Sequence, residues 1–171
     1  MTVIIREAAP ADDAGIAAVH RAAFPTSAEA GLVAALIAGD DVLLSLVAER
    51  DGVVVGHLLF SRVDASADGR PVAGAALAPV AVVPERQGLG IGGGLIDQGL
   101  AMLAERGVAL VFVLGDAEFY EQFGFDAALG ARFETPYAGD HWLALALDDR
   151  RWPKRGAVRH AAAFAQLENM G

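Results

Sequence analysis

Five of the eight residues from Gln87 to Gly94 are glycine, and this cluster separates two different sequence patterns. Before it, Val72 to Val83 is rich in residues that favour β-strands, and after it the apolar residues recur at helical spacing. Glycine permits positive φ and close approach of the main chain, and a helix start offers free N–H groups. The cluster therefore predicts a strand, a turn that binds an anion such as pyrophosphate, and a helix. A tight turn without a ligand is the alternative.

The residues ahead of the cluster predict an antiparallel meander. Val3 to Arg6 favours a strand, and two helices follow, ending near Phe24 and Gly39. The three longer strands expected next are 42–49, 53–63 and 72–83. Asp51-Gly52 and the segment 67–70 mark the turns between them, because such residues tolerate positive φ. Pro79 lacks a ladder donor, so we expect a bulge or irregularity there.

The residues after the cluster predict a parallel connection. The helix closes at Arg106-Gly107 and the fully apolar run Val108 to Leu114 is typical of a buried strand, which predicts a right-handed crossover. We expect a short helix over 116–123, extended chain from Phe125, a strand over 142–147 and a short strand over 158–160. The fold class is mixed α/β (α+β): one mostly antiparallel mixed sheet with helices on both faces. We expect one domain, with a core over 3–147 and a C-terminal extension over 148–171.

Composition excludes several classes of function. The 171 residues carry a net charge of -9, so a nucleic acid partner is not expected. Cysteine is absent, which excludes disulfides, thiolate zinc sites and a cysteine nucleophile. Neither a membrane-spanning run nor a signal peptide is visible, so we expect a cytoplasmic protein. Exposed strand edges and the C-terminal segment are compatible with a homodimer.

The order of elements narrows the kind of phosphate ligand. A Walker loop needs Gly-Lys-Ser/Thr, and the cluster has no lysine. Gly88, Gly90 and Gly93 fit the dinucleotide pattern G-x-G-x-x-G. In a Rossmann unit, however, this pattern follows the first parallel strand, whereas here an antiparallel meander precedes it. A nucleotide-binding oxidoreductase is therefore disfavoured.

Two motifs resemble the GCN5-related N-acetyltransferase (GNAT) family. Gln87-x-x-Gly90-x-Gly92 fits that family's Q/R-x-x-G-x-G/A signature for acetyl-CoA, and the strand before it resembles the family's central strand. The segment 119–125 resembles the F-Y-x-x-x-G-F segment that follows the fifth strand of the family. The resemblance extends from Val3 to about Leu147. The segments 115–120 and 159–164 resemble a bacterial subgroup of predicted acetyltransferases.

The resemblance implies a co-substrate, acetyl-CoA, and no metal. The residues it assigns to cofactor binding are Val82, Val83, Gln87, Gly88, Leu89, Gly90, Ile91, Gly92, Gly93, Phe119 and Phe123. Amides of the glycine cluster would hold the pyrophosphate, and the strand near Val83 would pair with the pantetheine arm. Tyr120 matches the tyrosine that protonates the departing thiolate. A tyrosine that only packs is the alternative.

The general base is not apparent in the sequence. The family often carries a glutamate near the fourth strand, but residues 75–78 contain no carboxylate. Glu29, His57, Glu85 and Asp116 are the remaining candidates, and a base acting through ordered water is equally compatible. Phe133, Tyr137, His141 and Trp142 lie where the family's acceptor-side loops run, and their roles stay open.

The resemblance implies an N-acetyltransferase that moves an acetyl group directly to a primary amine of a small molecule or peptide. The missing base keeps a second hypothesis open, a catalytically weak acetyl-CoA sensor module. The sequence does not identify the amine acceptor, because loops form that pocket and the fold does not set it.

Overall fold

In the computed structural model, residues 2–148 and 151–165 are described, and they group into two units. Unit 1 comprises residues 2–60, 79–99 and 162–165, and unit 2 comprises residues 61–78 and 100–161. The architecture is mixed α/β, and most of the strand pairs are antiparallel. The helices and strands, in chain order, are β1 (Ile4–Glu7), η1 (Pro10–Asp12), α1 (Asp13–Ala23), α2 (Ala28–Ala38), β2 (Val42–Arg50), β3 (Val53–Ala67), β4 (Arg70–Val72), β5 (Gly74–Val82), η2 (Pro84–Arg86), α3 (Ile91–Glu105), β6 (Leu110–Leu114), α4 (Ala117–Glu121), α5 (Ala127–Gly130), β7 (Phe133–Glu134), β8 (Trp142–Ala146), β9 (Gly156–His160) and η3 (Ala162–Phe164).

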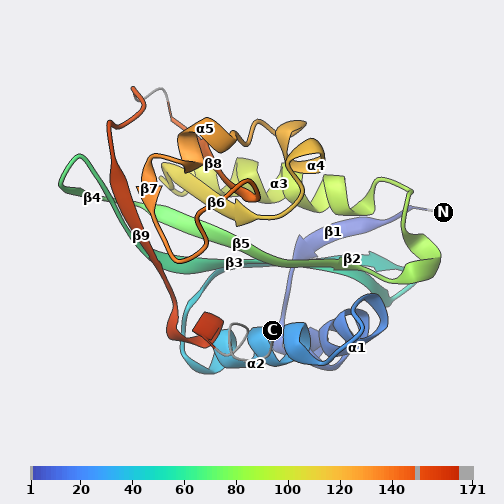
Figure 1. Ribbon diagram of the computed structural model, residues 1–171. Helices are drawn as coiled ribbons and strands as arrows, with labels where there is room; N and C mark the ends of the chain where they lie inside the picture. Colours follow the sequence, from blue (N-terminus) through green and yellow to red (C-terminus); the bar gives the residue numbers. More distant parts are fainter. Residues whose placement is uncertain (1, 149–150, 166–171) are drawn as a thin grey trace. The chain divides into compact units, whose positions relative to one another are not determined.

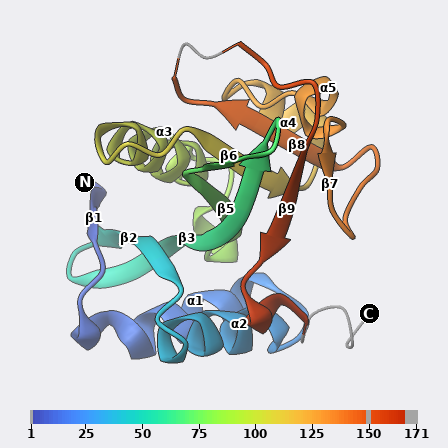
Figure 2. The ribbon, with the colours of Figure 1, turned by 90° about the vertical axis from the view of Figure 1, so that its left-hand side faces the viewer.

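The strands of unit 1 follow the order β1-β2-β3-β5. Helices α1 and α2 cover one face of these strands (Figures 1 and 2). The N-terminal part of α3 packs on β3 so closely that a Cβ on Gly99 would lie 2.5 Å from the ring of Phe60. Glycine at position 99 therefore allows the helix and strand backbones to approach.

Alternation along β3 separates two environments in unit 1. A Cβ on Gly56 would meet the side chains of Ile91 and Leu95 of α3. The next residue, His57, points to the other side and forms a hydrogen bond with His20 of α1. Successive side chains of β3 therefore point to opposite faces, and both faces are buried here. Burial of both faces explains why most of residues 55–61 are apolar.

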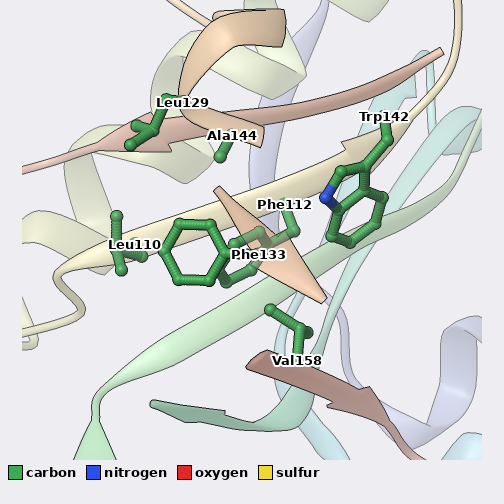
Figure 3. Close-up of a cluster of buried hydrophobic side chains, with 7 residues drawn as sticks. All are labelled: Leu110, Phe112, Leu129, Phe133, Trp142, Ala144 and Val158. Atoms are coloured by element: carbon green, nitrogen blue, oxygen red, sulfur yellow. The ribbon is translucent and has the colours of Figure 1, made fainter. Parts of the chain in front are cut away.

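In unit 2 the strand order is β3-β5-β6-β8. Strand β6 runs parallel to β5, with Gly74 opposite Leu110, and antiparallel to β8. Strand β9 pairs antiparallel with β3 and parallel with β7. The core here is built around Phe112, which stacks on Trp142 with ring centroids 5.5 Å apart and meets Phe133 edge-on at 4.9 Å (Figure 3).

The two turns predicted from aspartate–glycine pairs are confirmed. Asp51 and Gly52 have φ of 52° and 78°, and Asp68 and Gly69 have φ of 50° and 79°. Asp68 also accepts hydrogen bonds from the backbone amides of Lys154 and Arg155. The second turn is therefore fastened to the chain segment that leads into β9.

Two local expectations were correct only in part. The long strand expected over 72–83 is interrupted at Ala73 and continues through Pro79, where we expected the irregularity. The β5–β6 ladder ends at Ala76, so a proline three residues later removes no bond from that ladder. Chain expected to be extended from Phe125 is extended only to Asp126, which forms an isolated antiparallel bridge with Ala144. It then enters helix α5, because the side chain of Asp126 accepts from the amides of Ala128 and Leu129.

Candidate functional site

The glycine cluster forms an exposed turn in unit 1 that leads directly into helix α3. Gly88 and Gly90 have φ of 77° and 83°, in the left-handed region that favours glycine. The positions that their Cβ atoms would occupy are open space. Backbone conformation, rather than crowding by the protein, therefore requires glycine here. Because α3 begins at Ile91, its first N–H groups lack carbonyl partners within the helix.

The side chain of Gln87 stabilises this turn. Its Nε2 donates a hydrogen bond of 2.9 Å to the carbonyl oxygen of Val82, the last residue of β5. The amide of Val83 donates to the carbonyl of Val55. These contacts fix the end of the strand and the entry to the turn. The exposed glutamine of the signature therefore stabilises the turn through a hydrogen bond within the protein.

The part of β5 that precedes this turn is not included in the ladder with β6. That ladder covers Gly74 to Ala76, and residues 79–82 lie outside it. A strand edge of this kind presents N–H and C=O groups that a ligand with an extended amide chain can pair with. The resemblance to the GNAT family predicts a pantetheine-binding role for Val82 and Val83, and the amide of Val83 is already used in a hydrogen bond to the carbonyl of Val55.

Tyr120 of α4 is the candidate proton donor in unit 2. The side chain packs against Gly115, where a Cβ would lie 2.5 Å from the tyrosine ring. Only 9% of Tyr120 is exposed, and burial raises the pKa of its hydroxyl. Among the residues that the structure describes, none forms a hydrogen bond with this hydroxyl. Tyr120 is therefore a protonated, rigidly held phenol at neutral pH.

The aromatic residues beside Tyr120 form an apolar surface. Phe119 is 38% exposed and Leu114, at the end of β6, is 52% exposed. Phe123 meets Phe119 with ring centroids 5.4 Å apart. Partly exposed apolar side chains gathered around one short helix are typical of a surface that contacts a ligand. This arrangement is compatible with the cofactor-binding roles predicted for Phe119 and Phe123.

His57 is fully buried and cannot reach a substrate. Its Nδ1 lies 2.8 Å from Nε2 of His20, and its Nε2 lies 2.8 Å from the hydroxyl of Ser45. Burial lowers the pKa of His57 to about 3 and that of His20 to about 4. Both rings are 0% exposed, so this cluster is part of the core of unit 1. The structure thus argues against His57 as a general base.

The three carboxylates considered for the base have different surroundings. Asp116 is the N-cap of α4, where its Oδ1 accepts from the amide of Glu118. Glu85 lies exposed in the first turn of η2. Glu29 of α2 has a buried Oε2 atom with no hydrogen-bond partner among the described residues. Among the described residues, Glu29 is therefore the one of these three carboxylates that has a buried oxygen without a hydrogen-bond partner.

His141 is a residue to which sequence reasoning gave no role. It precedes β8, is exposed, and places its Nδ1 3.2 Å from the carbonyl oxygen of Gly115. The backbone of the same two residues is joined by a hydrogen bond from the amide of Gly115 to the carbonyl of His141. No local signal marks this pairing, because it joins residues that are 26 positions apart.

Within residues 2–148 and 151–165, no group of three or more histidine, aspartate or glutamate side chains is placed to hold a metal ion. None of the described helices is long and apolar enough to cross a membrane.

Comparison with known families identifies one model that matches most of the chain. Residues 4–128 match the family model described as an acetyltransferase (GNAT) domain. Among curated proteins, the N-acetyltransferase YjhQ of Escherichia coli K12 is 40% identical over 158 residues, which cover 88% of this chain and 87% of YjhQ. The Escherichia coli N-acetyltransferase YhbS is 39% identical over 127 residues, which cover 74% of this chain and 75% of YhbS.

Solved structures of GNAT acetyltransferases also match this chain. The crystal structure of Escherichia coli YhbS in complex with CoA matches with a TM-score of 0.87 and 33% identity, over 95% of this chain and 92% of that one. The structure of a Brucella melitensis GNAT acetyltransferase in complex with acetyl-CoA matches with a TM-score of 0.79 and 38% identity, over 95% of this chain and 98% of that one.

Proposed function

Because the chain belongs to the GNAT acetyltransferase family, we propose that it transfers the acetyl group of acetyl-CoA directly to a primary amine of a small molecule or peptide. The observation that carries the proposal is the exposed turn with Gly88 and Gly90 at positive φ, which opens onto the start of α3. The complexes of similar proteins with CoA and acetyl-CoA support the choice of donor.

Main-chain amides would hold the pyrophosphate of the donor. The protein carries a net charge of -9, so long-range attraction does not bring an anion to this turn. Amides from Gln87 to Gly93 and the positive end of the α3 dipole supply local attraction instead. The extended pantetheine arm would pair with β5 beside Val82, through backbone groups that are not used in the ladder with β6.

The reaction needs few groups because the thioester is already activated. The amine nitrogen attacks the carbonyl carbon, the tetrahedral intermediate collapses, and the C–S bond breaks with its electron pair on sulfur. Tyr120 would then donate its proton to the thiolate. Burial suits the phenol to this role, because it keeps the proton on the oxygen until a basic partner forms nearby.

The test of donor binding is stabilisation of the folded protein by CoA. A ligand that binds only the native state, at about a hundredfold above its Kd, adds about 2.7 kcal/mol to the free energy of unfolding. A Tm that does not rise in millimolar CoA would contradict the proposal. Release of CoA from acetyl-CoA in the presence of a panel of amines then separates an enzyme from a sensor module, which binds without turnover.

A matched pair of variants at Gly90 separates charge from backbone conformation. Aspartate and asparagine have nearly the same shape and both tolerate positive φ, as Asp51 and Asp68 show in this chain. Gly90→Asp places a negative charge against the pyrophosphate, so it should abolish the stabilisation by CoA. Gly90→Asn should retain a substantial part of it. Equal loss in both folded variants would show that crowding, not charge, decides binding.

A further inference from the structure

Tyr120 and His141 both contact Gly115, at the end of β6. The tyrosine ring occupies the space where a Cβ of Gly115 would lie, and Nδ1 of His141 lies 3.2 Å from its carbonyl oxygen. Both residues belong to unit 2. A candidate acid and a second titratable group are therefore held by the same residue.

The strand register places the two side chains on the same face. Leu114 of β6 lies opposite Trp142 of β8, and one step further the amide of Gly115 donates to the carbonyl of His141. Residues directly opposite in an antiparallel pair direct their Cβ atoms to the same side. The Cβ direction of Gly115 leads to Tyr120, so the side chain of His141 leaves the backbone on the side where Tyr120 lies.

The contact with Gly115 favours one tautomer of His141. A carbonyl oxygen only accepts hydrogen bonds, so this contact is a hydrogen bond when Nδ1 of His141 carries the proton. In the neutral ring, Nε2 is then the nitrogen with the free lone pair. Among the described residues none forms a hydrogen bond with Nε2, and the residue is exposed. This is the arrangement of an imidazole prepared to accept a proton.

We propose that His141 is the general base of the acetyl transfer, an inference that rests on the proposed function. Nε2 of His141 takes one proton from the acceptor ammonium and leaves a neutral amine. The amine nitrogen forms a bond to the thioester carbon, the C–S bond breaks, and the thiolate takes the proton of Tyr120. The second proton released by the nitrogen returns the tyrosine to its neutral form, and the imidazolium loses its proton to solvent. The balance is one ammonium and one acetyl-CoA to one amide, one CoA thiol and one proton.

His141→Asn is the variant that separates a base from a structural role. The asparagine amide replaces the Nδ1–H donor toward Gly115 but has no group at the position of Nε2. His141→Ala removes both. If His141 is the general base, kcat of both variants should fall by about 10²-fold, within the range for general base catalysis, while stabilisation by CoA is unchanged. Free imidazole should restore part of the activity of His141→Ala. A structural role predicts that only His141→Ala is impaired and that imidazole has no effect.

The assay measures release of CoA from acetyl-CoA, both with the amine panel and with water as the acceptor. A His141→Asn protein that turns over like the wild type while CoA still stabilises it would overturn the role of His141 and leave the proposed function intact. If CoA stabilises the wild-type protein but no acceptor causes release of CoA, the role of His141 as a base is overturned together with the proposed activity, because there is no proton transfer to catalyse. Loss of activity in Glu29→Gln, with His141→Asn normal, would identify the carboxylate of α2 as the base.

Discussion

Moderate acid should destabilise this protein through the buried pair His20 and His57. Both rings are neutral in the folded state, because burial holds their pKa values at about 4 and about 3. In the unfolded chain each ring has the ordinary value of 6.5. Below pH 6.5 the unfolded state therefore binds protons that the folded state does not. Stability is fully present above pH 6.5 and is lost as the pH falls toward 4.

The size of this loss follows from the difference between the pH and the pKa of the unfolded rings. At pH 5 the pH is about 1.5 units below that pKa, and each unit corresponds to about 1.36 kcal/mol. Each histidine therefore removes about 2 kcal/mol, and the pair removes about 4 kcal/mol of the 5–15 kcal/mol typical of a domain. Asp12, which faces His57, acts in a different range, because its hydrogen bond with Arg6 lowers its pKa to about 2. The carboxylate stays charged throughout the interval from pH 6.5 to pH 5.

Urea unfolding at pH 7 and pH 5 measures this loss. With an m-value of about 2 kcal/mol per M, the midpoint should fall by about 2 M. Imidazole NMR signals of the folded protein supply the control, since neither His20 nor His57 should titrate between pH 7.5 and pH 5. A midpoint that does not move, or a folded-state titration of either ring near pH 6.5, would contradict this prediction.

Further substitutions test the site and the turns. Tyr120→Phe keeps the ring and removes the donor, so kcat should fall by about 10²-fold with little change in CoA affinity; an unchanged kcat, with chemistry limiting, would leave Tyr120 a packing role. Gly115→Ala forces the tyrosine ring to move, since the new Cβ would lie 2.5 Å from it, and should lower kcat more than it weakens CoA binding. Asp68→Ala removes the acceptor of two backbone amides at a residue with φ of 50° and should cost about 1–3 kcal/mol in urea unfolding, whereas Asp68→Asn should cost less.

The features predicted correctly from the sequence are those with local causes. The aspartate–glycine turns follow from the positive φ that these residues tolerate, and the glycine-rich entry to α3 follows from a compact cluster in the sequence. Helix α5 also had a local signal, because Asp126 caps it through its own side chain. A rule that weighed this cap against the extended pattern expected from Phe125 would have found the helix.

Apart from helix α5, the features that were missed depend on contacts between distant residues. The tolerance of β5 for Pro79 depends on where the ladder with β6 ends, which no pattern within β5 reveals. The burial of His57 depends on His20, which lies 37 positions earlier. The Nδ1 of His141 has a partner only through the carbonyl of Gly115, which lies 26 positions earlier. In each case a residue's chemistry is set by a partner that is adjacent only in the fold.

The hydrogen bond between His20 and His57 also couples substitutions at these two positions during evolution. An N–H···N bond needs one ring to donate and the other to accept, so each histidine loses this bond when the other is replaced. Replacing one ring by an apolar residue leaves a buried nitrogen without its partner, at a cost of about 1–3 kcal/mol, whereas replacing both removes the need for the bond. Ser45 places no such demand, since a hydroxyl can donate or accept. Relatives of this protein should therefore carry both histidines or an apolar pair at these positions, and a lineage that passes from one state to the other should pass quickly.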